Sequence, residues 1–241
     1  MKRFGTIVSV ILTASIILLS CGCSSSSGGE VGSSDERLGP VNQNEYVLYL
    51  NIFNNGYAKN YDGKTVKKVG VFAILYDAFN DVNRYYVWGY RDTTKCCDWQ
   101  WEFSLQEEQE LPPVGSLVTV EGTFVSDDRA LDDYWIQDAT VTTNTIYTGP
   151  TYDVNMYVMS DTLERVQLIN VYRFPDVFMN KSFAAYGRIK TMTSFQDPYY
   201  DGSWYFDFSY KGSVPAIGTT VVLIGTVGNG IFNVNTLQAI D

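Results

Sequence analysis

Beyond residue 41, short runs of β-branched and aromatic residues alternate with groups of Gly, Pro, Asn and Asp. The clearest runs are residues 85–88, 99–103, 134–141 and 204–208. Runs of this length and composition predict strands, and the polar and glycine-containing segments between them predict turns. Their regular spacing indicates mainly β structure, with a minor helical part, folded into small antiparallel barrels.

The same pattern occurs twice, which predicts a tandem repeat. Residues 111–124 read LPPVGSLVTVEGTF and residues 214–227 read VPAIGTTVVLIGTV, so each contains Pro-x-apolar-Gly, a β-branched strand and then Gly-Thr. Gly122 and Gly225 stand where such a strand is expected to bend or bulge. The repeat extends in both directions, because residues 62–70 match residues 179–187, and residues 134–141 match residues 231–240.

A short helix is predicted before the second copy. Residues 161–164 form an Asp-x-x-Glu capping pattern, and Leu163, Val166 and Ile169 follow at close to helical spacing. Pro175 is expected to end this segment. The corresponding residues 46–53 of the first copy fit either a helix or an extra strand.

The N-terminal pattern predicts a lipoprotein signal. Two basic residues, Lys2 and Arg3, precede an apolar run at residues 7–19 that is shorter than the ~20 residues of a membrane-spanning helix. The run ends in Leu-Leu-Ser-Cys, which resembles the bacterial lipobox and implies that Cys21 carries diacylglycerol and becomes the new N-terminus. Cys23 lacks the leucine three places upstream, so Cys21 is the preferred site. An ordinary signal peptide or a membrane helix is the alternative.

The composition of the next segment completes the domain organisation. Residues 21–40 are rich in serine and glycine and predict a flexible tether. We therefore expect a signal peptide at residues 1–20, this tether, a first barrel domain at residues 41–146 and a second at residues 151–241. Such a chain would lie in the cell envelope, lipid-anchored and extracytoplasmic.

Charge and histidine content exclude several kinds of function. The chain has 17 basic and 27 acidic side chains, and loss of residues 1–20 removes two basic and no acidic ones, so the formal charge falls from −10 to −12. This charge argues against a nucleic acid partner, because phosphate binding depends on clustered Lys and Arg. The chain has no histidine, which excludes a Ser-His-Asp triad and His-ligated metals or haem. We expect no cofactor.

The order of motifs in the first copy carries a family resemblance. It runs Tyr-Asp-Gly-Lys-Thr-Val, Cys-Cys, Trp-Glu-Phe, Pro-x-Val-Gly and Val-Thr-Val-x-Gly-Thr between residues 61 and 123. This order is similar to the OB-fold domains of bacterial lipoproteins without established chemistry, and to the soluble OB domain of a permease-associated bacterial membrane protein family. The resemblance covers residues 62–141 and, more weakly, residues 179–241. It implies two tandem five-stranded OB-like barrels, each preceded by a short helix or extra strand, and it implies no particular activity.

The adjacent cysteines Cys96 and Cys97 allow three interpretations. They could be structural, as buried thiols or as a strained vicinal disulfide. They could bind a soft metal together with Asp98, although a closed site needs about four ligands. They could also act in thiol redox chemistry, although no histidine can lower the pKa of either thiol.

Aromatic side chains on the strands are candidates for a binding surface. Alternation places Trp99 and Trp101 on one face of a strand, and Tyr134 and Trp204 lie in two other predicted strands. An exposed aromatic face could stack sugars or bases, whereas buried rings would fill the cores that small barrels need. Acidic clusters at residues 107–110, 127–133 and 197–201 fit solvated loops, and a pair of carboxylates is also the machinery of a glycoside hydrolase.

These observations favour a non-catalytic binding or accessory protein. The membrane would be reached through the lipid on Cys21, and the folded part would contact a protein or a glycan. Thiol redox or soft-metal binding through the cysteine pair is one alternative, and a carboxylate-based hydrolase is the other.

Overall fold

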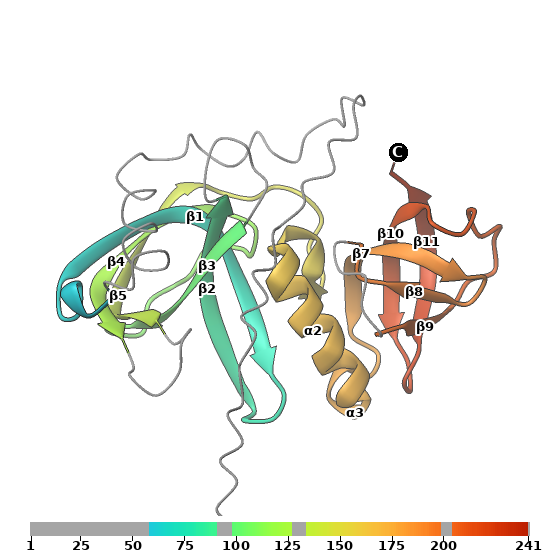
Figure 1. Cartoon of the computed structure of the whole chain (residues 1–241), viewed down its shortest axis with the longest axis horizontal. Helices are drawn as coiled ribbons and strands as arrows, with labels where there is room; N and C mark the ends of the chain where they lie inside the picture. The colour runs from blue at the N-terminus through green and yellow to red at the C-terminus, as the bar shows by residue number, and fades with distance from the viewer. Residues whose placement is uncertain (1–57, 91–97, 127–133, 199–203, 241) are drawn as a thin grey trace, which may run out of the picture.

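The computed structural model describes residues 58–90, 98–126, 134–198 and 204–240, which are mainly β structure around one central helix (Figure 1). The predicted signal peptide and tether, the predicted element at residues 46–53, and the cysteines Cys21, Cys96 and Cys97 lie outside these residues. Within the described ranges, no helix combines the length and hydropathy that a membrane span requires.

Five strands of the first half form a closed barrel. They are β1 (Thr65–Asp77), β2 (Val82–Tyr90), β3 (Asp98–Leu105), β4 (Leu117–Ser126) and β5 (Tyr134–Thr145), and a 3₁₀ turn, η3 (Ala58–Asn60), precedes them. The strand order is β1-β2-β3-β5-β4, and β4 pairs back with β1. The β3–β5 pair is parallel, and the other pairs are antiparallel.

The second half forms a sheet with the corresponding order. Its strands are β6 (Val154–Asn155), β7 (Ser182–Thr191), β8 (Ser194–Gln196), β9 (Phe206–Ser209), β10 (Thr220–Val227) and β11 (Phe232–Ala239). The run β7-β8-β9-β11-β10 repeats the order of the first barrel, β10 pairs back with β7, and β9 and β11 are parallel. Strand β6 adds a short parallel pairing to β7. The sequence pattern missed β8, which has only three residues.

Matching turns explain why the repeated motif produces the same strand connections. The N–H groups of Gly115 and Gly218 donate to the carbonyls of Phe72 and Ile189, each at 2.8 Å. Both glycines have a positive φ, 95° and 94°, which glycine adopts at little cost because it has no Cβ. The Pro-x-apolar-Gly pattern therefore specifies one turn in both halves.

The predicted bulges occur at Gly122 and Gly225. The β4–β5 register shifts between Glu121 and Thr123, and the β10–β11 register shifts between Ile224 and Gly225. A Cβ at Gly122 would lie 2.6 Å from the Gln137 carbonyl oxygen, and one at Gly225 would overlap the carbonyl of the facing strand. Glycine is required at both positions because the paired backbone comes too close for a side chain.

The predicted helix is α2 (Asp161–Arg173), which follows the 3₁₀ turn η4 (Met156–Val158) and precedes the short α3 (Pro175–Phe178). Its cap differs from the prediction. Ser160 is the N-cap, and its hydroxyl accepts the Leu163 N–H at 3.3 Å. Val166 is exposed, whereas Glu164 and Gln167 are buried. Leu163 is buried and Ile169 is half-buried, as the spacing predicted. The helix also has protein on other sides, so hydrophobic spacing predicted only part of its buried surface.

Helix α2 lies between the barrel and the second sheet (Figure 1). One hydrophobic cluster spans this junction, because Val71, Ala73 and Trp88 from the outer face of the barrel pack with the apolar side chains of α2 and the second sheet. A second cluster fills the barrel itself and includes Phe72, Trp101, Phe103 and Phe124. One apolar core thus joins the two halves. A second, separate core fills the barrel.

Candidate binding site between the two sheets

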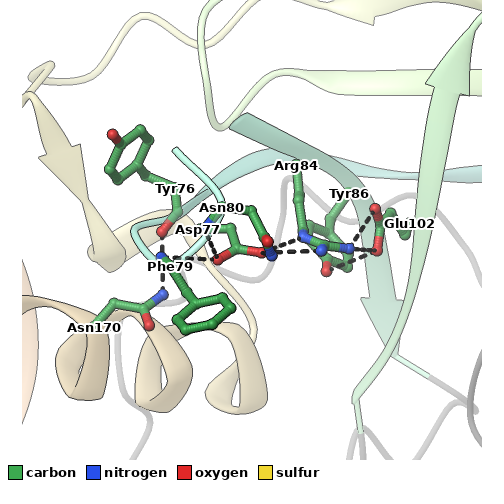
Figure 2. A network of polar contacts seen from close by, with 8 residues as sticks. All are labelled: Tyr76, Asp77, Phe79, Asn80, Arg84, Tyr86, Glu102 and Asn170. Atoms are coloured by element: carbon green, nitrogen blue, oxygen red, sulfur yellow. Dashed lines mark hydrogen bonds and ion pairs between the residues drawn. The ribbon is translucent and has the colours of Figure 1, made fainter. Parts of the chain in front are cut away.

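Hydrogen bonds connect α2 to the C-terminal end of strand β1. The N–H of Tyr76 donates to Gln167 Oε1 at 3.1 Å, and Asn170 Nδ2 donates to the Tyr76 carbonyl oxygen at 3.1 Å. Figure 2 shows the second of these contacts. Nearby, Trp88 Nε1 donates to the carbonyl of Val158 at 2.9 Å. These directed bonds fix how the helix lies on the barrel, which a purely apolar contact would leave less defined.

A pocket of about 200 Å³ lies in this junction. Strands β1 and β2 contribute one wall, and β6, α2 and α3 with the residues around them contribute the other. Exposed side chains, Asn83 and Asp153, stand at its rim, whereas Asn155, Met159 and Gln167 are buried. The pocket is partly open, is lined by both exposed and buried residues, and includes residues from both halves.

Two buried amides line this pocket. Gln167 is 1% exposed and Asn155 is 6% exposed. One end of each amide is held, because Gln167 Oε1 accepts the Tyr76 N–H and Asn155 Nδ2 donates to the Pro150 carbonyl at 3.4 Å. The other ends, Gln167 Nε2 and Asn155 Oδ1, have no hydrogen-bond partner among the described residues.

An unpaired buried donor or acceptor costs about 1–3 kcal/mol, so native proteins keep few of them. Both unpaired atoms are inaccessible to water, so they lie in the packing around the pocket and do not open into it.

The charged groups at the rim have opposite signs. Asp153 accepts hydrogen bonds from the Ser182 N–H at 2.8 Å and from the Ser182 hydroxyl at 2.7 Å. The hydroxyl bond is the main cause that lowers the pKa of Asp153, and the nearby Lys181 adds to it. The Lys181 ammonium lies 5.3 Å from the centre of the Tyr76 ring. The rim thus carries one carboxylate and one ammonium.

A group of carboxyls surrounds the first turn of α2. The Thr162 N–H donates to Asp98 Oδ2 at 3.3 Å, and the Tyr186 N–H donates to Glu164 Oε1 at 2.6 Å. Burial raises the pKa of Glu164 well above its usual value, and the charges of Asp197 and Asp161 add to this, whereas the Tyr186 N–H opposes it.

Asp161 belongs to the same group and differs from Glu164 in exposure. Loss of hydration, followed by repulsion from Asp98 and Asp197, raises the pKa of Asp161 to about 7. The side chain of Asp161 is exposed, and water at that face weakens the effect. Within the described ranges, no cluster of three or more His, Cys, Asp or Glu side chains has a geometry that could hold a metal ion.

The hairpin that forms one pocket wall is braced by the network in Figure 2. Arg84 Nε and Nη2 both lie 2.9 Å from Asp77 Oδ2, and Arg84 Nη1 lies 3.2 Å from Glu102 Oε1. The Tyr86 hydroxyl donates to Glu102 Oε2 at 3.2 Å. Burial is the main cause that raises the pKa of Tyr86. The network ties β1, β2 and β3 together, so it supports the wall rather than facing the pocket.

The predicted aromatic face is not a surface. Trp99 is 5% exposed and Trp101 is 1% exposed, and both belong to the core cluster of the first barrel with Phe103. Alternation was right to place them on one face, but that face points inward. A barrel this small needs large inward side chains to exclude water, so the rings fill it. The expectation of a binding surface formed by Trp99 and Trp101 is therefore wrong.

The other candidate residues have different surroundings. Trp204 is half-buried just before β9, where it contacts the Tyr172 ring and lies 5.2 Å from the Arg173 guanidinium. Tyr134 begins β5, and its side chain is outside the described part of the structure. Asp98 begins β3 and bonds α2. These residues do not come together in one site, and Cys96 and Cys97, the proposed neighbours of Asp98, lie outside the described residues.

The acidic clusters also separate by environment. Glu107, Glu108 and Glu110 are exposed in the β3–β4 connection, as expected of a solvated loop. Asp197 is instead 5% exposed beside β8. Residues 127–133 and Asp201 lie outside the described ranges. Asp197, which the sequence assigned to a solvated loop, is therefore buried.

Sequence reasoning missed the pocket residues Asn155, Gln167 and Lys181. Gln167 follows Leu163 at helical spacing, so a polar residue within the predicted buried face was the available signal. Nothing in the sequence indicated that β1 would lie opposite that face.

Comparison with models of known protein families gives no match, and no curated protein matches the chain either. Function must therefore be inferred from the geometry of the junction.

Proposed function

We propose that this protein is a non-catalytic binding module that is lipid-anchored outside the cytoplasm and takes its ligand in the pocket between its two β units. The partner would be a glycan or a protein that presents a small polar group to the pocket. The observation that carries this proposal is the pocket of about 200 Å³ between the two units, which is lined by exposed polar residues such as Asn83 and Asp153 as well as by buried ones.

We infer that the two units are OB-like barrels. The order β1-β2-β3-β5-β4, the return pairing of β4 with β1 and the parallel β3–β5 pair support this assignment. The run β7-β8-β9-β11-β10 has the same order and directions. OB barrels are partly open five-stranded Greek-key barrels that commonly bind ligands, and here the pocket lies between two units rather than on the face of one.

The anchoring part of the proposal depends on the sequence. The basic start, the short apolar run and the lipobox-like residues before Cys21 support lipid attachment, and residues 21–40 supply a tether. A tethered module with a charge of −12 would be held at the membrane by its lipid and repelled by anionic headgroups, which keeps the folded part accessible to partners.

A binding experiment with matched variants tests this function. The full chain in detergent, with Gln167→Met and Gln196→Met variants, is applied to a glycan array and to cell-envelope extracts for crosslinking and pull-down. Gln196 is also a buried amide without a partner among the described residues, and it does not line the pocket. We expect Gln167→Met to lose partners that Gln196→Met retains. Loss in both variants, or in neither, would reject the pocket as the binding site.

The carboxyl group around α2 supports a second candidate, a carboxylate-based hydrolase. Asp161 is exposed, its pKa is raised to about 7, and Asp98 and Asp197 are close enough to repel its charge. An exposed acid whose pKa is raised by neighbouring carboxylates is a pattern found in acid–base catalysis. A panel of chromogenic glycosides tests this idea. Turnover that Asp161→Asn abolishes would support it, and equal turnover by that variant would contradict it.

A further inference from the structure

We infer that an open groove over strand β9 of the second sheet binds an alkylammonium group, carried either by a free amine or by a lysine side chain. The groove is separate from the junction pocket, because no described residue lines both. The inference therefore goes beyond the proposed function and does not depend on it.

The groove is formed by one strand and two turns. It has a volume of about 550 Å³, within the range of about 300–1,000 Å³ that is usual for small-molecule sites. Strand β9 contributes Asp207 and Ser209, the turn between β7 and β8 contributes Met192 and Thr193, and the turn before β11 contributes Ile231. The two β9 residues and the two residues of the β7–β8 turn are exposed, so a ligand in solvent can reach them.

Backbone hydrogen bonds hold both turns in place. The Phe208 N–H donates to the Thr193 carbonyl oxygen at 2.8 Å, which fixes the β7–β8 turn beside β9. The Gly228 N–H donates to the Ile231 carbonyl oxygen at 2.7 Å and closes the turn between β10 and β11. The groove therefore exists before a ligand binds, and binding needs little ordering of the chain.

The charge of the groove favours a cation. Asp207 is the only charged side chain among the described residues of the lining. Its carboxylate makes no hydrogen bond or ion pair with another described residue. The next lysine along the chain, Lys211, is exposed and does not line the groove. A cation would gain an ion pair here, whereas an anion would meet a carboxylate of its own sign.

The hydrogen-bonding groups of the groove also suit an ammonium group. Asp207 and Ser209 lie on the same exposed face of β9, because side chains alternate along a strand. A carboxylate can only accept hydrogen bonds. The Ser209 hydroxyl donates to Asn233 Oδ1 at 3.0 Å, so its remaining capacity is to accept. An ammonium group has three donors and no acceptor, so it matches these two groups, which a phosphate or carboxylate ligand would leave unpaired.

The remaining lining side chains suit an alkyl stem and its charged end. Met192 is 59% exposed and Ile231 is half-buried, and both offer apolar surface to a stem. Tyr210 also lines the groove, and a Cβ at Gly212 would lie 2.6 Å from its Cζ and Oη, so the ring rests against that backbone. A tyrosine ring held in this way attracts an ammonium group through its π face. This attraction is needed because an exposed ion pair alone contributes little.

Binding measurements with matched probes test the ligand class. The full chain in detergent is mixed with cadaverine, with spermidine or with the peptide acetyl-Gly-Lys-Gly-amide. Pentanol, pentanoate and acetyl-Gly-Gln-Gly-amide are the matched probes without an ammonium group. Ligand-observed NMR reports binding. We expect the three ammonium probes to bind and the other three not to bind. The tighter of the free amines and the lysine peptide identifies the source of the ammonium group.

Two pairs of variants locate the site. Asp207→Asn removes the carboxylate of the groove, and Asp176→Asn removes an exposed carboxylate outside it. Met192→Lys adds a competing ammonium group to the groove, and Met179→Lys adds the same group at an exposed position outside it. We expect Asp207→Asn to weaken binding about fivefold and Met192→Lys to abolish it, whereas each control changes the affinity less than about twofold.

The outcomes separate this inference from the proposed function. Binding that neither Asp207→Asn nor Met192→Lys weakens more than its control does would overturn the groove as the site. Equal binding of pentanol or the glutamine peptide would overturn the alkylammonium assignment, as would failure of all three ammonium probes to bind. None of these results would reject the junction pocket, because none of the four variants changes a residue of its lining.

Discussion

Replacement of Glu164 by glutamine should stabilise the protein at neutral pH. Glu164 is 1% exposed, accepts the Tyr186 N–H at 2.6 Å, and lies near the carboxyls of Asp161 and Asp197. Two effects compete for its charge. The Tyr186 N–H and the N-terminus of α2 favour the carboxylate, whereas burial and the neighbouring acids favour the protonated form. The structure predicts that burial wins, so the native pKa is raised.

The sign and size of the effect follow from proton linkage. The unfolded chain releases this proton near pH 4.3, and the native protein holds it to higher pH, so folding becomes less favourable as pH rises above 4.3. The interval from pH 4.3 to pH 7 corresponds to about 3.7 kcal/mol at most. Glutamine has nearly the same shape, keeps an oxygen for the Tyr186 N–H and does not titrate, so it removes this loss.

Urea unfolding at pH 4.0 and pH 7.0 measures the prediction. We expect Glu164→Gln and the wild-type protein to differ by less than about 1 kcal/mol at pH 4.0, and the variant to be more stable at pH 7.0, by no more than about 3.7 kcal/mol. Glu108→Gln, at an exposed position, is the matched control and should show no such pH dependence. A variant less stable than wild type at pH 7.0 would show that the carboxylate is ionised and held by Tyr186 and the helix, which would refute the reasoning.

Four further predictions concern other parts of the chain. Trp101→Ala should destabilise the protein by about 3–5 kcal/mol, measured by chemical denaturation, because Trp101 is 1% exposed in the barrel core. Gly225→Ala should cost about 1–3 kcal/mol and lower the melting temperature, since its Cβ would overlap the Asn233 carbonyl. Arg84→Met should cost about 1–3 kcal/mol in the same assay, because it leaves the carboxylates of Asp77 and Glu102 without their shared partner. Cys21→Ala should prevent incorporation of radiolabelled fatty acid and move the protein from the membrane to the soluble fraction; unchanged labelling would reject Cys21 as the lipid site.

In the barrel core, the strand pattern predicted which side chains share a face but not the direction in which that face points. Alternation correctly placed Trp99, Trp101 and Phe103 on one face of β3. It could not tell whether that face points into the barrel or toward solvent, because a period of two only separates the two faces. Closure of the sheet through the β4–β1 pairing made that face the interior.

Helix α2 shows the same limit for a helical pattern. Its position and its end before Pro175 were predictable, because a turn signal and a proline bound the segment. Its buried surface was predictable only in part, because Leu163 is buried as the spacing predicted and Val166 is exposed. Gln167 and Glu164 are polar residues that local hydrophobicity assigns to solvent, and they are buried because the barrel and the second sheet meet the helix on different sides.

The sequence by itself determined the local structure of this protein. The repeated Pro-x-apolar-Gly turns, with Gly115 and Gly218 at positive φ, and the bulge glycines Gly122 and Gly225 depend on backbone sterics that one residue and its neighbours dictate. The tertiary structure decided the candidate site. Asn155 and Gln167 lie 12 residues apart in the sequence, and Tyr76 of the other unit holds one of them. Their meeting depends on how two sheets dock through a helix, and that arrangement is set by long-range packing that no local pattern encodes.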